Sequence, residues 1–201
     1  MKKAKIGVLV SGGGTNLQAL IDAQNSGIIT DGEIKVVISN KADAYALERA
    51  KNANIATEVV LKKDCTDSND FEQKIIDALT KYEIDIIVLA GFMSILSESF
   101  TSRYPERIIN VHPSLIPSFC GKGFYGLTVH EKALEYGVKV TGATVHFVNE
   151  IPDGGKIIMQ KAVEIKEGDT PEVLQKRVME QAEWIILPQS VQKVAKDIIF
   201  K

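Results

Sequence analysis

Asn110 and His112 stand two positions apart at the end of an apolar run and could act together in catalysis. The run includes Ile108 and is stopped by Pro113, which is typical of a buried strand reaching its end. Because side chains alternate along a strand, the amide and the imidazole project from the same face. An amide can donate to a developing oxyanion, and an imidazole can move protons near neutral pH. Taken alone, the pair is equally compatible with an ordinary polar strand end that leads into a loop.

A second candidate site lies near the start of the chain, where Ser11-Gly12-Gly13-Gly14 breaks the apolar run 6–10. We expect Thr15 to begin a helix, with Gln18 completing a capping box. The backbone N–H groups of such a loop and the dipole of the helix attract an anion such as phosphate. The loop is neither a P-loop nor a dinucleotide fingerprint, since Leu17 stands where the third glycine would be. A tight turn that binds nothing is the alternative.

Short apolar runs alternate with amphipathic segments up to residue 112. The runs predict parallel-type strands at 6–10, 34–38, 55–61, 84–89 and 107–112. Helices are expected to begin near Asp43, Asp67 and Ser97. This alternation predicts an α/β fold with a Rossmann-like, mostly parallel twisted sheet and helices on both faces. Ligands of such sheets bind outside the carboxyl ends of the strands, so the two candidate sites should share one crevice.

The second half of the chain opens with a proline- and glycine-rich loop from 113 to about 126. A helix at 129–136 follows, then two alternating strands at 139–148 and 156–165 joined by a Pro-Asp-Gly turn. These strands bring the expected total to about seven. The last helix is expected to be capped by Thr170 and kinked or split by Pro188.

Several residues of this half are ambiguous from local sequence. Asp153 is a routine turn residue, and His130 is expected at the surface of its helix. His146 lies in mid-strand and is expected to be a structural histidine with its hydrogen bonds satisfied. The aromatic side chains of the long loop either pin it or close over a ligand. They are Phe119, Phe124 and Tyr125.

The composition is that of one globular domain: 201 residues, of which 45% are hydrophobic and 25% charged. Lys and Arg number 24 against 26 Asp and Glu, so no basic excess favours binding to nucleic acid or to a membrane surface. The two cysteines, Cys65 and Cys120, are far apart and do not support a disulfide framework or a zinc site. The first apolar run is too short for a signal peptide, so a cytoplasmic protein is expected.

With these motifs assembled, the chain resembles the folate-dependent formyltransferases over nearly its full length. The stretch 110–117, Asn-Val-His-Pro-Ser-Leu-Ile-Pro, carries the pattern N-x-H-P-S-L-x-P that is specific to that superfamily. The loop 11–16 resembles the pattern S-G-x-G-[ST]-N of the branch that acts on glycinamide ribonucleotide. Other matching segments are Ser39-Asn40-Lys41-Ala42, Leu89-Ala90-Gly91-Phe92-Met93, Thr141-Gly142, Thr144-Val145-His146-Phe147-Val148 and Asp153-Gly154-Gly155.

The resemblance implies transfer of a formyl group from the co-substrate 10-formyltetrahydrofolate to the amine of glycinamide ribonucleotide, in de novo purine (IMP) biosynthesis. It implies a single formyltransferase domain over 1–201, with a nucleotide- and phosphate-binding half at 1–112 and a folate-binding and C-terminal half at 113–201. The implied partners are these two small molecules, with no metal, no nucleic acid and no membrane. The protein would be a monomer or a homodimer in the cytoplasm.

The resemblance also assigns residues to roles. Catalytic positions are matched by Asn110, His112 and Asp153. Substrate-binding positions are matched by Gly14, Thr15, Asn16 and Glu183. Folate-binding positions are matched by Asn69, Met93, Ser94, Ile95, Leu96, Asn110, Asn149, Glu150, Ile151, Pro152 and Asp153. The family often carries arginine at the positions of Asn69 and Ser94, so how the glutamate tail of the folate is held stays open. The last helix resembles the family pattern with one extra residue near Glu183.

In the implied chemistry, the amine attacks the formyl carbon and charge builds on the formyl oxygen. Asn110 and a protonated His112 would stabilise that oxyanion, each such donor being worth about 2.7–4 kcal/mol. Asp153 would raise the pKa of His112, hold its ring and order a water that relays the proton of the amine.

Three other functions use related sequences. A formyltetrahydrofolate hydrolase would use water as the acceptor on the same three residues, and resembles a longer chain with an N-terminal regulatory domain. A methionyl-tRNA formyltransferase would need a C-terminal RNA-binding domain and a basic surface. A catalytically silent nucleotide-binding module would not require the three polar catalytic residues.

Overall fold

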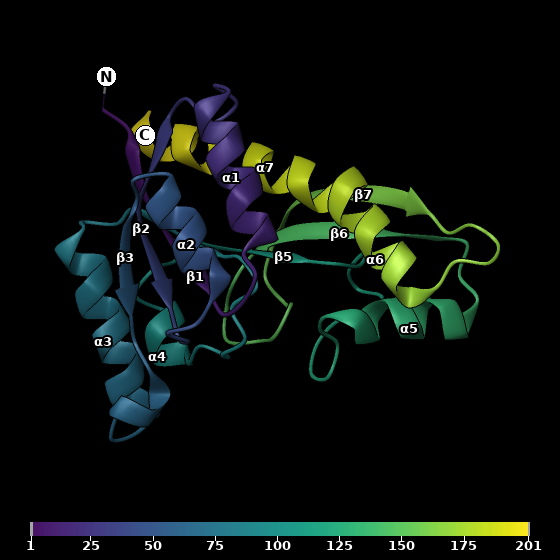
Figure 1. Ribbon diagram of the computed structural model, residues 1–201, viewed down its shortest axis with the longest axis horizontal. Coiled ribbons are helices and arrows are strands. Elements are labelled where there is room, and N and C mark those ends of the chain that lie inside the picture. The colour runs from purple at the N-terminus through teal and green to yellow at the C-terminus, as the bar shows by residue number, and fades with distance from the viewer. Residues whose placement is uncertain (1, 201) are drawn as a thin grey trace.

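Within residues 2–200, which the computed structural model describes, the strands form one seven-stranded sheet (Figure 1). The strands are β1 (Ala4–Val10), β2 (Gly32–Ser39), β3 (Ala56–Val59), β4 (Ile86–Leu89), β5 (Ile108–His112), β6 (Val140–Phe147) and β7 (Ile157–Glu164). Their order in the sheet is β3-β2-β1-β4-β5-β6-β7. The pairs from β3 to β5 are parallel, and β5–β6 and β6–β7 are antiparallel. The Rossmann-like, mostly parallel sheet is thereby confirmed.

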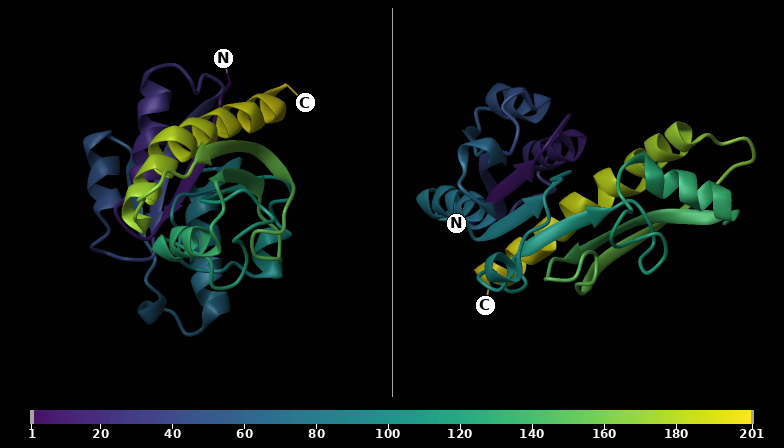
Figure 2. Two further views of the ribbon diagram at one scale, coloured as in Figure 1. Left: turned by 90° about the vertical axis from the view of Figure 1, so that its right-hand side faces the viewer. Right: turned by 90° about the horizontal axis from the view of Figure 1, so that it is seen from below.

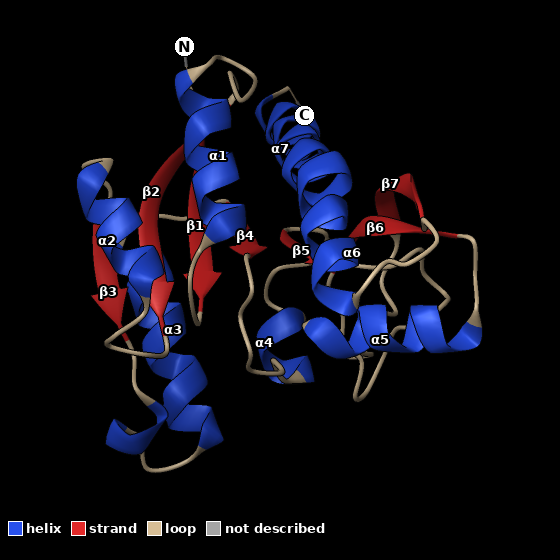
Figure 3. Ribbon diagram, turned by 45° about the vertical axis from the view of Figure 1, so that its right-hand side comes forward, coloured by secondary structure: helices blue, strands red, loops and turns tan. Residues whose placement is uncertain are grey.

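Helices cover both faces of this sheet, as Figures 2 and 3 show from different sides. They are α1 (Thr15–Asn25), α2 (Tyr45–Asn52), α3 (Ser68–Lys81), α4 (Glu98–Thr101), α5 (Leu127–Tyr136), α6 (Pro171–Val178) and α7 (Trp184–Ile199). One core cluster lies beneath α1, α2, α6 and α7 and includes Leu20 and Val191. A second lies beneath α3 and α4 and includes Ile75 and Phe100. None of the helices described is long and apolar enough to cross a membrane.

The starts of the helices divide into two groups. Side chains cap α3, α4 and α6 as expected: Asp67, Ser97 and Thr170 accept from backbone N–H groups in the first turn. The expected capping box at Thr15 is wrong, because Gly14 precedes α1 in the left-handed conformation, with φ 73°, and no side chain caps the helix. Asp43 does not cap α2 either. The first N–H groups of α1 therefore have no side-chain acceptor from a cap.

The last helix is interrupted before Pro188, not at it. A π-helical turn, Met179–Glu183, separates α6 from α7, and Pro188 lies inside α7. The helix is therefore not split at Pro188, because the break in α-helical geometry comes at the π turn before it. A π turn accommodates one residue more than an α turn, as the extra residue expected near Glu183 would require.

The long loop after β5 is tied to the sheet and to α5. The Thr144 hydroxyl on β6 donates to the Ser114 carbonyl at 2.7 Å and accepts from the Ile116 N–H at 3.1 Å. The Phe119 ring lies 6.3 Å from that of Phe124 and 6.0 Å from that of Tyr136 on α5. Phe119 therefore ties the loop to α5, Phe124 packs on Phe119 within the loop, and Tyr125 is exposed.

His130 on α5 is fully buried, so the expectation of a surface histidine is wrong. Burial, with a smaller effect of the nearby His112, lowers the pKa of His130 to about 4. It shares the buried side of α5 with Val129 and Ala133. Its imidazole is neutral at pH 7.

An ion pair anchors the start of α6 and generates a prediction. Arg177 donates through Nη2 to Asp169 Oδ1 at 2.6 Å and through Nη1 to Oδ2, and this pairing lowers the pKa of Asp169 to about 2. Arg177→Met should lower the free energy of unfolding by about 1 kcal/mol near pH 7, a value kept small by solvent screening. Because the folded-state pKa is depressed, the difference should vanish as the pH falls from about 4 through 2.

Urea unfolding at several pH values measures this difference. Lys176→Met removes a charge from the same helix at an exposed position and serves as the matched control. An equal loss of stability in the control, or a difference that does not change with pH, would contradict the assignment.

Candidate active site

The loops at the carboxyl ends of β1, β2 and β4 are joined directly. The Ser11 hydroxyl accepts from the Met93 N–H at 2.8 Å, which ties the glycine loop to the exit of β4. The Asn40 amide at the end of β2 donates to the Ser94 hydroxyl at 3.0 Å. β4 in turn pairs with β5, Leu89 lying opposite Asn110. The glycine loop and the Asn110/His112 strand tip therefore lie along one edge of the sheet, as expected.

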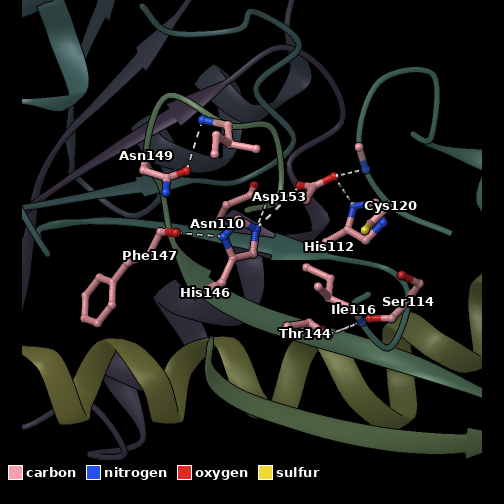
Figure 4. Close-up of polar contacts among 12 residues, drawn as sticks. Asn110, His112, Ser114, Ile116, Cys120, Thr144, His146, Phe147, Asn149 and Asp153 are labelled. Atoms are coloured by element: carbon pink, nitrogen blue, oxygen red, sulfur yellow. Dashed lines mark hydrogen bonds and ion pairs between the residues drawn. The ribbon is translucent and has the colours of Figure 1, made fainter. Parts of the chain in front are cut away.

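Asp153 bridges two histidines at this edge (Figure 4). Its Oδ2 lies 3.5 Å from His112 Nδ1 on β5, and its Oδ1 lies 3.5 Å from His146 Nε2 on β6. The Asn110 amide nitrogen lies 3.2 Å from His146 Nε2. Because β5 and β6 pair with Asn110 opposite His146, the four polar side chains gather over one part of the sheet. The fold thus brings together the three residues expected to be catalytic and adds a fourth.

Backbone carbonyls determine which ring nitrogens carry protons. His112 Nε2 lies 2.9 Å from the Phe119 carbonyl oxygen, which can only accept, so Nε2 donates. His146 Nδ1 lies 2.8 Å from the Phe147 carbonyl oxygen and donates in the same way. The remaining nitrogen of His146 can then accept from Asn110. This contact fixes the orientation of the Asn110 amide and leaves its second N–H for another acceptor.

Asp153 is held in place by its own backbone and by the long loop. It lies in the turn between β6 and β7 with φ 56°, a left-handed conformation that aspartate adopts more readily than most residues. Its Oδ2 accepts from the Gly121 N–H at 2.9 Å. Burial by itself raises the pKa of Asp153, but the two imidazoles and the Gly121 N–H outweigh it and the pKa is lowered. The carboxylate is therefore ionised near neutral pH.

Burial, not Asp153, dominates the titration of His112. Its side chain is only 5% exposed, and desolvation lowers its pKa below the usual value of 6.5. The Asp153 charge and the Phe119 carbonyl both raise the pKa but do not overcome desolvation. Asp153 therefore raises the pKa of His112 as expected, but desolvation is larger and the net shift is downward. The resting imidazole is mostly neutral at pH 7.

His146 is the site residue that the sequence did not single out from its surroundings. As expected it is a buried histidine with its hydrogen bonds satisfied. Its Nε2 lies against two other site residues, the Asn110 amide and the Asp153 carboxylate. The signal for this role is the register of β5 against β6, which places His146 across from Asn110. That register is not readable from either strand alone.

The expected substrate-binding residues form a second cluster at the start of α1. The Asn16 amide donates to Glu183 Oε2 at 2.8 Å, and Glu183 comes from the π turn. Glu183 is 6% exposed, and burial raises its pKa while the Asn16 hydrogen bond lowers it. Gly14 and Thr15 precede Asn16 in the same turn. The four residues expected at this site therefore lie together.

The expected folate-binding segments differ in exposure. Met93 and Ile95 at the exit of β4, and Ile151 in the β6–β7 turn, are large apolar side chains exposed by 58%, 77% and 57%. Ser94 and Leu96 are buried, Ser94 being bonded to Asn40. In the turn, the Asn149 side chain accepts from the Ile151 N–H at 3.1 Å and, with Glu150 and Pro152, leads to Asp153. Asn69 is exposed in the first turn of α3, and no contact found among the described residues joins it to these segments.

Among residues 2–200, no group of three or more histidine, cysteine, aspartate or glutamate side chains is arranged to hold a metal ion. The chemistry visible at the site is that of oriented hydrogen-bond donors, a neutral imidazole and an ionised carboxylate. Such a set can stabilise an oxyanion and relay a proton.

Comparisons with known proteins point the same way. The family model described as formyl transferase matches residues 4–191. The chain is 47% identical to a phosphoribosylglycinamide formyltransferase of Haemophilus influenzae, covering 92% of this chain and 84% of that protein. It is 46% identical to the trifunctional purine biosynthetic protein adenosine-3 of Homo sapiens, but it spans only 19% of that protein's length. The crystal structure of glycinamide ribonucleotide transformylase 1 from Symbiobacterium toebii superposes with a TM-score of 0.90 at 41% identity, covering 97% of this chain and 89% of that one.

The contacts of His112 generate a second prediction. Its pKa should lie below 6.5 in the wild type, and Asp153→Asn should lower it further, because the carboxylate favours the imidazolium. Asparagine also tolerates the left-handed backbone at this position, so the turn should persist. The ring proton shifts of His112, followed by NMR against pH, measure both values. Glu150→Gln, in the same turn, is the matched control, and a higher pKa in Asp153→Asn would refute this account.

Proposed function

Because the chain belongs to the formyl transferase family, we propose that it transfers the formyl group of 10-formyltetrahydrofolate to the amine of glycinamide ribonucleotide. The observation that carries the proposal is the cluster of Asn110, His112 and Asp153, in which the end of β5 meets the turn between β6 and β7 and His146 of β6 contacts both. The glycine loop on the same sheet edge supports a phosphorylated acceptor. The reaction would belong to de novo purine biosynthesis in the cytoplasm.

Formyl transfer requires stabilisation of the charge that develops on the formyl oxygen. In the proposed reaction the amine nitrogen forms a bond to the formyl carbon, and the bond from that carbon to the folate nitrogen breaks. The free N–H of the Asn110 amide and the Nε2–H of His112 are the donors for the oxyanion. In the structure the Phe119 carbonyl oxygen accepts from His112 Nε2, so an oxygen acceptor fits at this position. In the proposed reaction the formyl oxygen would replace the Phe119 carbonyl there.

The amine must also lose a proton, and the folate nitrogen must gain one. His112 is neutral at rest, and its pKa would rise as negative charge develops beside it. The ionised Asp153 carboxylate favours the same rise. A water bound by Asp153 would carry the proton of the amine to the departing folate nitrogen. No charge is then left on either product.

The two halves of the chain would bind the two substrates. In the half 1–112, Gly14, Thr15 and Asn16 present N–H groups to the phosphate of the acceptor. Glu183 would reach the same substrate from the π turn, through its contact with Asn16. Binding at the remote phosphate would orient the amine toward the formyl carbon, which favours reaction by proximity.

The half 113–201 would supply the folate site, together with the exit of β4. The exposed apolar side chains Met93, Ile95 and Ile151 offer a surface for the flat pteridine ring. Ser94 is buried and bonded to Asn40, so the glutamate tail would have to be held from elsewhere. Exposed Asn69 on α3 is the other position proposed for the tail.

An assay with both substrates tests the reaction. Tetrahydrofolate should form from 10-formyltetrahydrofolate only when glycinamide ribonucleotide is present, because the amine is the acceptor. Ultraviolet absorbance follows the folate, and mass spectrometry follows the formylated amine. Folate product formed at the same rate without the amine would instead identify a formyltetrahydrofolate hydrolase.

Removal of the oxyanion donors tests the roles of the residues. His112→Ala and Asn110→Ala should each lower kcat by about 10²–10³-fold, the usual loss for one such donor. Thermal melting should show that both variants remain folded. Asn52→Ala, at an exposed position on α2, is the control for an asparagine deletion. Turnover within twofold of wild type in His112→Ala would disprove the mechanism.

A further inference from the structure

The glycine loop is held from behind by α2. The Ala46 N–H in the first turn of α2 donates to the Gly12 carbonyl at 3.1 Å. One turn later, Arg49 Nε donates to the Gly13 carbonyl at 2.8 Å. Two successive carbonyls of the loop are therefore drawn toward the same helix.

This arrangement determines where the N–H groups of the loop point. In a trans peptide the carbonyl and the following N–H point in opposite directions. When the Gly12 and Gly13 carbonyls face α2, the N–H groups of Gly13 and Gly14 face away from it. No protein acceptor is found for either N–H among the described residues. Successive backbone N–H groups that point the same way form an anion-binding concavity.

The contact between the loop and α2 is too close to shift easily. A Cβ atom on Gly14 would lie 2.6 Å from Ala46 Cβ, and φ at Gly14 is 73°, where side chains are rarely tolerated. The loop backbone thus rests directly against α2. The loop cannot move toward α2 as a unit, so either carbonyl could be displaced only by rotation of its peptide plane.

Arg49 is itself fixed on three sides. Its Nη1 donates to the Gln18 side chain at 3.0 Å, and its guanidinium lies 5.0 Å from the centre of the Tyr45 ring. Together with the Gly13 contact, these interactions use the planar, multi-donor shape of arginine. The side chain is held on the carbonyl side of the loop, opposite to the free N–H groups.

We propose that Arg49 is a positioning residue for the phosphate site, holding the Gly13 carbonyl so that the Gly13 and Gly14 N–H groups face the anion. It acts through the loop backbone and not as a direct partner of the phosphate. The inference rests on the proposed function for the identity of the substrate. The orientation of the loop itself does not depend on that identity.

Steady-state kinetics of Arg49→Met and Arg49→Lys test this role. Arg49→Met should raise the KM for glycinamide ribonucleotide about tenfold, with kcat and the KM for 10-formyltetrahydrofolate changed less than twofold. Arg49→Lys should recover only part of the affinity, because lysine cannot reproduce the forked contact with Gly13 and Gln18. Lys51→Met removes a charge from the exposed side of the same helix and should leave all three parameters unchanged.

Amide NMR with inorganic phosphate as the probe gives a readout that needs no turnover. In the wild type, phosphate should shift the Gly13 and Gly14 amide resonances, and Arg49→Met should move the midpoint to about tenfold higher phosphate. Wild-type amides that do not shift at saturating phosphate would overturn the proposal, whether or not the variants fold. Full affinity in Arg49→Lys would also overturn it, because charge alone would then suffice. Wild-type protein inactive toward the amine, with these shifts intact, would instead refute only the proposed function.

Discussion

The Asp153 carboxylate, held between His112 and His146, is the interaction on which the rest of the site depends. Its two oxygens contact imidazoles from neighbouring antiparallel strands, and one of them also accepts from the Gly121 N–H of the long loop. One side chain therefore links the strand tip, the adjacent strand and the loop above them. A carboxylate so little exposed requires a hydrogen-bond donor, which the Gly121 N–H supplies, because an unpaired charge there would be strongly destabilising.

The same burial controls the chemistry of His112. Desolvation lowers its pKa and outweighs the attraction of Asp153, so the ring is mostly neutral before substrate arrives. Because burial weakens solvent screening, a negative charge that develops beside this neutral ring would interact with it strongly. In the resting protein the Phe119 carbonyl satisfies the donor that the reaction would use. The long loop therefore provides partners for two buried groups of the site, the Phe119 carbonyl for His112 and the Gly121 N–H for Asp153.

The glycine loop follows a different physical rule, because the donors that it presents are backbone N–H groups and not side chains. No cap satisfies the start of α1, and α2 draws the loop carbonyls to the opposite side. Both features leave N–H groups turned toward one region. The proposed site would thus combine a backbone anion-binding loop at one end with a side-chain proton relay at the other, joined through the carboxyl edge of the sheet.

Much of this could be predicted from the sequence. The alternation of apolar runs and amphipathic segments determined the parallel sheet, because burial on both faces requires continuous apolar strands. The period of two along β5 placed Asn110 and His112 on one face. The expected starts of α3, α4 and α6 were correct, since their side-chain caps depend only on residues within one turn. These features are all governed by contacts between residues close together in the chain.

Other features depended on contacts between distant segments, and only the tertiary structure decided them. The pairing of β5 with β6 brought His146 to Asn110, the packing of α5 buried His130, and α2 took the Gly13 carbonyl through Arg49. The pKa of His112 was likewise decided by burial, whose extent no local pattern reveals. Asn110 and His112 were visible from the sequence because a single strand aligns them. Asp153 lies 41 residues beyond His112, and only the folded chain brings its carboxylate to within 3.5 Å of the ring.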